Sequence, residues 1–365
     1  MRAVSISNIK EGNILGKSIY SSEGRLLLSK GMELDKKLVS TLRKHQIMYV
    51  YIEDRISEGI EIHSIVDEKI IIETIGTMKK IFDMAMYRSK GKEKMEWIPL
   101  QAHLEVQNVI ENILYNLKEN ENVLYSMTEL MGTDMYTYKH SVNVSILAIL
   151  TARSLGIEEK EIRDVAMGAL LHDLGKTRIE PDILNKTSEL TEEEIELIGK
   201  HPEYGYDIVK NDLSLSYITK QIIYSHHEFL DGSGYPRKLK GDEISIYSMI
   251  VTICDMFDSM TSDKFGRRKM SIYKALEIMS AKTFDKLDDN VYNRFIENIA
   301  IYPIGTGVIL EDGRKGIVVD IHRSCPTRPI LRIIEGKGNA EYYEIDLMKN
   351  LTIFISDVID LDNIK

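Results

Sequence analysis

The chain contains little cysteine: only Cys254 and Cys325 occur among its 365 residues. Two cysteines supply neither a disulfide framework nor a cysteine-based zinc motif. No run of 18 consecutive apolar residues occurs, so we expect no membrane-spanning helix. Residues 1–11 also lack the apolar segment that a secretory signal needs. These absences favour a soluble cytoplasmic protein.

An excess of positive charge is missing as well. The formal net charge is -10 at pH 7, so we expect no polymeric nucleic acid as a partner. An acidic protein can still bind an anion where bound metal ions and a few cations reverse the local field. Hydrophobic residues form 43% of the chain, which supports real cores rather than disorder.

Length and hydrophobic pattern predict a multidomain protein, because 365 residues exceed one ordinary domain. The predicted fold is an all-α catalytic bundle flanked by a small α+β N-terminal unit and a small β-rich C-terminal unit. The predicted segments are the α+β module at 1–55, a helical connector at 60–122, the catalytic bundle at 123–300 and the β-rich module at 301–365.

Alternating apolar residues and glycine turns place the strands of the two terminal modules. In the first module we expect paired strands at 18–20 and 25–28, a helix at 34–44 and a strand at 47–52. In the last module we expect strands at 308–310, 317–319, 331–334 and 351–355. No cluster of potential ligands falls in either module, so we interpret both as interaction or regulatory units.

Histidine is concentrated in one part of the chain. Five of the nine histidines fall between residues 140 and 227: His140, His172, His201, His226 and His227. Neutral imidazole is the commonest metal ligand, and clustered histidine with aspartate suits divalent ions. A single histidine at a helix end is more often a cap or a surface group. The adjacent pairs His172-Asp173 and His226-His227 favour a metal site over that alternative.

The predicted helices of this region end at the candidate ligands. One helix delivers His172 and Asp173 at its end. Thr191 opens a capping box for a helix that runs to His201, and Pro202 ends that helix or begins the next. Ligands at the ends of packed helices can converge although they are distant in sequence. The helices are predicted at 158–171, 191–201, 218–227 and 245–260.

This donor set suits phosphate chemistry. Two metal ions held close together can activate a water and clamp both oxygens of an in-line phosphoryl displacement. Asp173 is the natural bridge, because its two oxygens can face two ions. His226 and His227 would point about 100° apart on a helix, so we do not expect them to serve one ion equivalently. Lys176 lies one turn later and can reach the same phosphate as a point charge.

Residues from about 123 to 300 resemble the HD-GYP family, a branch of the HD phosphohydrolase superfamily, whose catalytic bundle is all-α. The resemblance covers about half of the chain and rests on a combination of motifs. These are Tyr136-Thr137-Tyr138-Lys139-His140, His172-Asp173-Leu174-Gly175-Lys176, His201-Pro202-Glu203-Tyr204-Gly205, His226-His227-Glu228, Asp231-Gly232-Ser233-Gly234-Tyr235-Pro236 and Asp255-Met256-Phe257-Asp258-Ser259-Met260.

The resemblance implies a phosphodiesterase that hydrolyses cyclic di-GMP, a bacterial second messenger, to linear pGpG, and it allows further hydrolysis to GMP. It implies two divalent metal ions, iron or manganese, as cofactors. Asp173, as the bridge, and Lys176, beside the phosphate or the leaving oxygen, are the implied catalytic residues. The role of His227 depends on how many metals are present. The implied metal ligands are His140, His172, Asp173, His201, His226, His227 and Asp255.

The chain departs from the family pattern in two places. Some members have a glutamate four residues before the first histidine that helps hold a third metal, and here Tyr136 takes that position, so we predict two metals. Lys264 and Arg267 keep the charges of a segment where the family often has Arg-Pro-Tyr, but lysine cannot make a bidentate phosphate contact. A solvated cationic loop is the alternative. The implied substrate contacts are Lys176, Gly234, Tyr235, Pro236, Lys264 and Arg267.

Two alternative functions stay open. The enzyme can act on another cyclic dinucleotide, such as hybrid cyclic GMP-AMP, because the segment from Lys264 to Arg267 departs from the family. A non-catalytic nucleotide-binding sensor is disfavoured, because no ligand of the set is missing. We further expect signalling proteins as partners of the terminal modules, and a homodimer.

Overall fold

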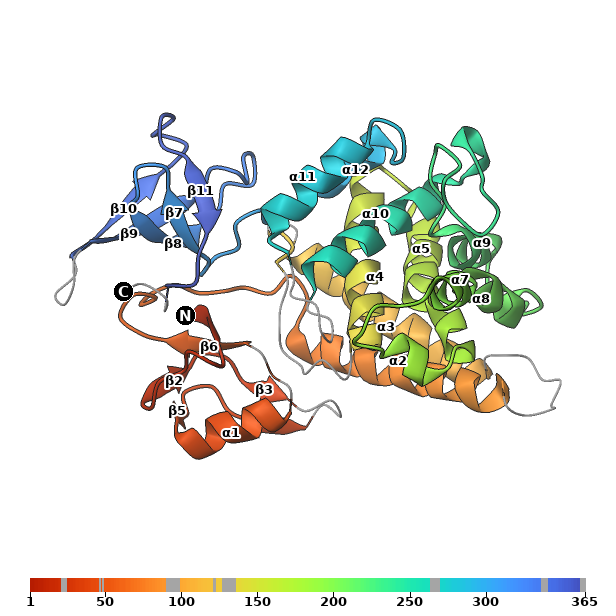
Figure 1. Ribbon diagram of the computed structural model, residues 1–365, viewed down its shortest axis with the longest axis horizontal. Helices are drawn as coiled ribbons and strands as arrows, with labels where there is room; N and C mark the ends of the chain where they lie inside the picture. Colours follow the sequence, from red (N-terminus) through yellow and green to blue (C-terminus); the bar gives the residue numbers. More distant parts are fainter. Residues whose placement is uncertain are drawn as a thin grey trace.

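The computed structural model describes residues 1–20, 25–45, 47, 49–89, 99–120, 123–126, 136–262, 270–335 and 341–361. A helical bundle lies beside two small β units (Figure 1). The predicted fold, an all-α bundle with an α+β unit before it and a β-rich unit after it, is confirmed. Within these ranges no helix has both the length and the apolar character needed to cross a membrane. The exact segment boundaries stay predictions.

The N-terminal unit is a sheet of short strands with one helix packed on it. Helix α1 (Lys36–Lys44) begins after Asp35, whose side chain accepts a hydrogen bond from the Leu38 amide at 2.7 Å. Leu42 of α1 packs with the sheet residues of this unit in one core. The strand order is β1-β6-β2-β5, with β1 (Arg2–Ser5), β2 (Asn13–Leu15), β5 (Glu33–Leu34) and β6 (Tyr49–Glu53).

The predicted strand pair of this unit is also present. Strands β3 (Ile19–Tyr20) and β4 (Leu26–Leu28) pair antiparallel and form a separate two-stranded sheet. The turn expected between them, at 21–24, lies outside the described residues. The predicted helix at 34–44 and strand at 47–52 correspond to α1 and β6, each shifted at its start by two residues.

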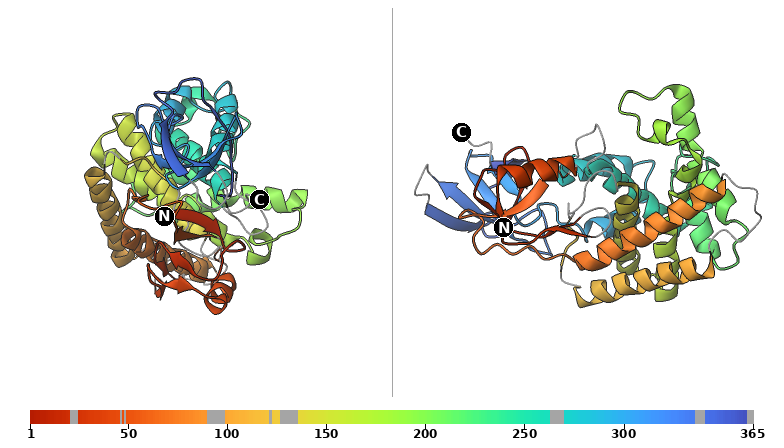
Figure 2. Two further views of the ribbon diagram at one scale, coloured as in Figure 1. Left: turned by 90° about the vertical axis from the view of Figure 1, so that its left-hand side faces the viewer. Right: turned by 90° about the horizontal axis from the view of Figure 1, so that it is seen from below.

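The bundle is built around helix α4 (Tyr136–Ser154), whose residues from His140 to Ala152 are all buried. A helix enclosed on every side needs apolar or small residues all round, as this one has. Helices α2 (Glu68–Ser89) and α3 (Leu100–Glu119) lie side by side along one flank (Figure 2). Both share one hydrophobic core with α4 and α5 (Glu159–Leu171), so the segment predicted as a connector packs on the bundle.

The remaining helices complete the bundle and end close to where the sequence places them. The capping box at Thr191 is present, with the hydroxyl accepting from the Glu194 amide at 3.3 Å and the Glu194 carboxylate accepting from the Thr191 amide at 2.8 Å. The helix predicted to run to His201 ends two residues earlier, and a new helix begins at His201. The bounds are η2 (Leu174–Arg178), α6 (Pro181–Leu184), α7 (Glu192–Gly199), α8 (His201–Val209), α9 (Tyr217–Ser225), η3 (Gly241–Glu243), α10 (Ile246–Thr261), α11 (Ile272–Lys282) and α12 (Asp289–Ile296).

The C-terminal unit is a five-stranded antiparallel sheet of order β10-β9-β8-β7-β11. The strand predicted at 351–355 is wrong for most of its length, because β11 begins only at Ile355. The carbonyls of Leu351 and Ile353 instead accept hydrogen bonds from the Arg328 guanidinium at 3.1 and 3.0 Å, which keeps them out of a ladder. The bounds are β7 (Gly307–Leu310), β8 (Lys315–Asp320), β9 (Ile330–Glu335), β10 (Glu341–Asp346) and β11 (Ile355–Val358).

The two β units contact each other directly. Ile60, after the N-terminal sheet, packs with Ile317 and Leu361 of the C-terminal unit in a small core of their own. The Arg332 guanidinium of β9 donates hydrogen bonds to the carbonyls of Ile56 at 3.2 Å and Glu58 at 2.6 Å. These contacts make the segment between β6 and α2 a shared seam of both β units.

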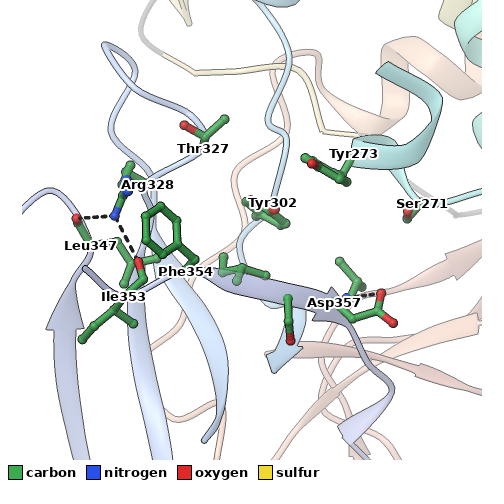
Figure 3. A pocket seen from close by; sticks show the side chains of 12 residues that line it. Ser271, Tyr273, Tyr302, Thr327, Arg328, Leu347, Ile353, Phe354 and Asp357 are labelled. Carbon is green, nitrogen blue, oxygen red and sulfur yellow. Dashed lines mark hydrogen bonds between the residues drawn. The ribbon is translucent and has the colours of Figure 1, made fainter. Parts of the chain in front are cut away.

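The C-terminal sheet also meets the bundle, at α11. A cavity of about 280 Å³ opens between them, with Tyr273 of α11 on one side and Phe354 on the other (Figure 3). The rings of Tyr273 and Tyr302 are nearly parallel, 6.4 Å apart between centroids, and Arg328 lies over the Phe354 ring at 4.6 Å. The sheet therefore touches the bundle through aromatic side chains around a gap rather than through a closed core.

Replacing Arg332 by alanine is expected to loosen the seam between the β units, since the charged donor to two backbone carbonyls is lost. A loss of about 1–2 kcal/mol would raise the rate of amide hydrogen exchange at residues 56–60 about 5–30-fold. Arg314→Ala is the matched control, because Arg314 bonds only within its own unit in the contacts described, to Asp312 and Tyr343. Equal rates of amide hydrogen exchange at residues 56–60 in both variants would contradict the role of Arg332 in joining the two β units.

Candidate metal centre

The seven predicted ligands meet at one place in the bundle. They are His140 of α4, His172 and Asp173 at the end of α5, His201 at the start of α8, His226 and His227 after α9, and Asp255 of α10. All except His227 are buried. Three groups have ligand atoms within 4.8 Å of one another: His140, His172 and Asp255; His201, His226 and His227; and His172, Asp173 and His226. Each of these groups can hold a metal ion.

Three of the imidazoles are oriented by backbone carbonyls. Nδ1 of His172 lies 2.8 Å from the Ala169 carbonyl oxygen, and Nδ1 of His201 lies 2.8 Å from that of Ile198. Nδ1 of His226 lies 3.1 Å from the carbonyl of Ile223. A carbonyl only accepts, so each Nδ1 carries the ring proton and each Nε2 keeps a lone pair. Metal-binding histidines are held in this way by their other nitrogen.

The lone pairs of His201 and His226 face each other. Their Nε2 atoms lie 3.1 Å apart, and both rings carry their proton on Nδ1. With no proton between them, this contact is a close approach of two acceptors rather than a hydrogen bond. A cation shared by both nitrogens would turn that repulsion into attraction.

Two buried atoms of the site lack any hydrogen-bond partner in the part of the chain that the structure describes. They are Nε2 of His172 and Oδ1 of Asp173. A buried polar atom without a partner is costly, and such atoms in native proteins call for a reason such as a bound ion. Imidazole nitrogen with carboxylate oxygen is the donor set that divalent transition ions prefer. The residues present therefore fit a metal-binding role.

Asp173 lies between the groups of imidazoles. Its Oδ1 is 3.4 Å from Nε2 of His201, and its Oδ2 is 3.5 Å from Nε2 of His172. Lys176 approaches from the adjacent turn, with Nζ 2.6 Å from Oδ2. Each oxygen thus faces a different set of donors, as a bridging carboxylate requires.

The electrostatics keep four of the five imidazoles neutral and the carboxylates of Asp173 and Asp255 charged. Burial lowers the pKa of His172, holds those of His201 and His226 well below the usual range, and lowers that of His227 to about 4. Burial alone would raise the pKa of Asp173, but the neighbouring His172 imidazole and the Lys176 ammonium hold it well below its usual range. Neutral imidazoles and ionised carboxylates are the forms that bind metals.

His140 differs from the other histidines, because both of its nitrogens face carboxylates. Nδ1 lies 2.7 Å from Oδ2 of Asp258, and Nε2 lies 2.9 Å from Oδ1 of Asp255. Burial alone would lower the pKa of His140, but these hydrogen bonds raise it to about 9. The Tyr136 ring stacks on His140 at 5.5 Å between centroids. Sequence reasoning assigned no role to Asp258, although its spacing of three residues from Asp255 on one helix was visible.

The expected separation of His226 and His227 on a helix is wrong. Helix α9 ends at Ser225, so His226 caps it and His227 lies in the turn beyond. Their rings are 4.3 Å apart between centroids. One ring nitrogen of each residue lies within 4.8 Å of a ring nitrogen of His201. The two residues can therefore serve one ion together.

The loop after the histidine pair folds back onto it. The Tyr235 amide donates to the His227 carbonyl at 3.1 Å, and the Tyr235 ring lies 4.8 Å from the His227 ring. A Cβ on Gly234 would collide with the backbone of His227, Glu228 and Phe229, so only glycine allows this approach. Pro236 follows in the same loop. Gly234 and Tyr235 thus lie against His227, and the substrate contacts expected of Gly234, Tyr235 and Pro236 stay predictions.

Glu228 holds the far end of this loop. Its side chain is buried, and its two oxygens accept hydrogen bonds from the amides of Arg237 at 2.7 Å and Leu239 at 3.0 Å. In the sequence, the signal for this role is limited to the position of Glu228 next to the histidines. The other predicted substrate contacts, Lys264 and Arg267, lie outside the described residues.

Comparison with known proteins agrees with this geometry. Residues 116–291 match the family described as HD domain, and residues 307–365 match the family described as KOW domain associated with HD domain. A solved HDG"Y"P protein of Bdellovibrio bacteriovorus, Bd1817, has a TM-score of 0.51 and 16% identity, and covers 80% of this chain and 97% of its own. That likeness concerns the fold.

Curated relatives share sequence with the bundle. A cyclic di-GMP phosphodiesterase of Pseudomonas aeruginosa is 32% identical over 226 residues, covering 62% of this chain and 54% of the relative. A 3'3'-cGAMP-specific phosphodiesterase of Vibrio cholerae is 34% identical over 168 residues, covering 46% of this chain and 36% of the relative. The chain spans about half the length of the curated relatives it matches.

The helical bundle that holds the paired His-Asp and His-His residues lies in the segment that matches the HD domain, and its donor groups can hold metal ions. The motifs of this segment resemble those of the HD-GYP family, and several relatives of similar sequence are named cyclic di-GMP phosphodiesterases.

A methyl group on Gly175 is expected to disturb the site from behind. An added Cβ there would collide with the His201 carbonyl and the Gly205 amide, so Gly175→Ala should push α8 away. We expect a loss of about 1–3 kcal/mol in stability together with weaker metal binding. Gly199→Ala is the control, because nothing lies within 4 Å of its Cβ position. Thermal unfolding and Mn²⁺ binding of both variants check this, and identical behaviour would contradict it.

Proposed function

We propose that this chain is a metal-dependent phosphodiesterase that hydrolyses cyclic di-GMP to linear pGpG, with GMP as a product of a second hydrolysis. The observation that carries the proposal is the pair of three-donor groups with the Asp173 carboxylate between them. The names of several relatives support the substrate, since they are cyclic di-GMP phosphodiesterases of other bacteria.

We assign one metal ion to each three-donor group. His140, His172 and Asp255 would hold the first, while His201, His226 and His227 would hold the second, and Asp173 would reach both. Iron or manganese is proposed because imidazole and carboxylate donors without thiolate suit these ions. Ions bound there would supply positive charge to phosphate oxygens and lower the pKa of a water.

The residues of the chain have distinct tasks in this proposal. Asp173 fixes the distance between the two donor groups, and its negative charge offsets part of the charge of the ions. Lys176, one-quarter exposed beside Asp173, can move its ammonium to a phosphate oxygen or to the leaving oxygen. Tyr235 borders the site next to His227, and burial keeps the pKa of its hydroxyl above the ordinary value, so the hydroxyl stays protonated and can donate to the substrate.

Hybrid cyclic GMP-AMP is the second candidate substrate. It is favoured by the likeness to a 3'3'-cGAMP-specific phosphodiesterase of Vibrio cholerae. The chemistry at phosphorus is the same for both dinucleotides, so the metal centre does not distinguish them. The difference must come from contacts to the bases. Signalling partners of the terminal units and a homodimer also remain proposals.

Protein purified without oxygen and loaded with Mn²⁺ or Fe²⁺ is expected to convert cyclic di-GMP to pGpG, measured by chromatography of the products. Chelation of the metal should stop the reaction. Asp173→Ala should abolish both metal retention and turnover, since it removes the carboxylate between the two groups. Tight nucleotide binding without any product would instead support a sensor.

Lys176→Ala is the variant to compare with Asp173→Ala, because it tests the role of the cation beside the same carboxylate. It removes a cation beside the same carboxylate but no donor of a three-membered group. We expect it to keep its metal ions and to lose turnover by about 10²-fold, the usual effect of removing one charge-stabilising donor. Loss of the metals in Lys176→Ala would show that the lysine is structural and would contradict its assigned role.

A mixture of cyclic di-GMP and 3'3'-cGAMP at equal concentration tests the choice of substrate. Faster consumption of cyclic di-GMP is expected, and the ratio of the two initial rates gives the ratio of kcat/KM. A ratio below one would make the hybrid dinucleotide the substrate and overturn the first choice.

A further inference from the structure

We propose that Asp258 is a positioning residue that holds His140 in the tautomer and orientation needed to bind metal. The inference rests on the proposed metal-dependent function, but it concerns how this chain builds one ligand. Asp258 is fully buried, 118 residues from His140 in sequence, and belongs to none of the groups of potential metal donors found in the described residues.

The carboxylate of Asp258 accepts from three side chains. Oδ2 lies 2.7 Å from Nδ1 of His140 and 3.1 Å from the Ser262 hydroxyl, and Oδ1 lies 2.8 Å from the Asn143 amide nitrogen. An ionised carboxylate only accepts, so Nδ1 of His140 must carry a proton. The remaining nitrogen, Nε2, is then the one that can bind an ion. It points at the site, 2.9 Å from Asp255 and 3.8 Å from Asp173.

The position of His140 in its helix explains why a side chain is needed. His172, His201 and His226 lie at or next to helix ends, where the carbonyls of the last turn have no partner within the helix. Carbonyls of these last turns orient the three rings. His140 lies in the second turn of α4, whose carbonyls bond to amides four residues later. Because these carbonyls already accept hydrogen bonds within α4, the Nδ1–H group of His140 donates instead to a carboxylate of another helix, that of Asp258 in α10.

Asp255 and Asp258 belong to the same face of α10, because residues three apart on a helix are neighbours. One helix thus holds both edges of the His140 ring, with Asp255 at Nε2 and Asp258 at Nδ1. When an ion takes the place of the Nε2 proton, the bond to Asp258 is the contact that keeps the ring in place. A carboxylate at Nδ1 also raises the basicity of Nε2 more than a carbonyl does, which makes Nε2 a stronger metal ligand.

The test measures metal affinity rather than turnover. Mn²⁺ binding is followed by equilibrium dialysis, with the free ion measured by electron paramagnetic resonance, for wild type, Asp258→Ala, His140→Ala and the double variant. Asp258→Ala is expected to weaken binding of one of the ions about 10–100-fold. If Asp258 acts through His140, the same change made in the His140→Ala background should cause no further loss.

Asn143→Ala is the matched control. It removes another hydrogen bond to the same carboxylate but leaves the His140 contact in place, so Mn²⁺ affinity should stay close to that of wild type. Asp258→Ala removes the acceptor of three donors, of which those of His140 and Asn143 are buried. If circular dichroism shows that it does not fold, Asp258→Asn decides the question, with a smaller loss of affinity that again disappears in the His140→Ala background.

Each outcome separates this inference from the proposed function. Equal losses with and without His140, or equal losses in the Asp258 and Asn143 variants, would overturn the positioning role and leave the phosphodiesterase proposal intact. The expected affinities together with no dinucleotide hydrolysis would support the positioning role and overturn the phosphodiesterase. A wild-type chain that binds no Mn²⁺, Fe²⁺ or Co²⁺ would overturn both.

Discussion

The fold depends on bringing several lone pairs together out of water. Three imidazole nitrogens and a carboxylate oxygen face one another in the interior, and two of these atoms have no hydrogen-bond partner among the described residues. Such a cluster is unfavourable by itself, because each buried acceptor has lost its water. The arrangement is stable only if positive charge enters it. Among the described residues, the ammonium that contacts Asp173 is that of Lys176, and it donates to one of the two carboxylate oxygens.

Backbone carbonyls at the ends of helices orient three of these rings. The last carbonyls of a helix have no partner within the helix. A histidine just beyond that end can donate a hydrogen bond from Nδ1–H to one of them. His172 after α5 and His226 after α9 both do so, and His201 uses the end of α7 although it begins α8. This gives a reason for α5, α7 and α9 to end at the site. It also explains why His140, inside a long helix, depends on Asp258.

Sequence reasoning predicted what is local and missed what depends on distant contacts. The motifs of the HD-GYP resemblance named seven residues that the structure brings together, and the helical periodicity located most helix ends to within about two residues. The separation of His226 and His227 was misjudged because periodicity does not locate a helix end to within two residues. Asp258 was missed because its partner lies 118 residues away. The short strand at 351–355 failed for a similar reason, since Arg328 takes the carbonyls that a ladder would need.

The β units reach the metal centre by way of one helix. Asp255 and Asp258 lie on α10, and Thr261 at its end lines a cavity of about 420 Å³. The other walls of that cavity include Tyr51 of the N-terminal sheet and Gly305 before the C-terminal sheet. Because the two β units are joined by Arg332 and by a small core of their own, they would move as a pair. Helix α10 therefore runs from the wall of this cavity, which both β units share, to the carboxylates that its middle turns carry.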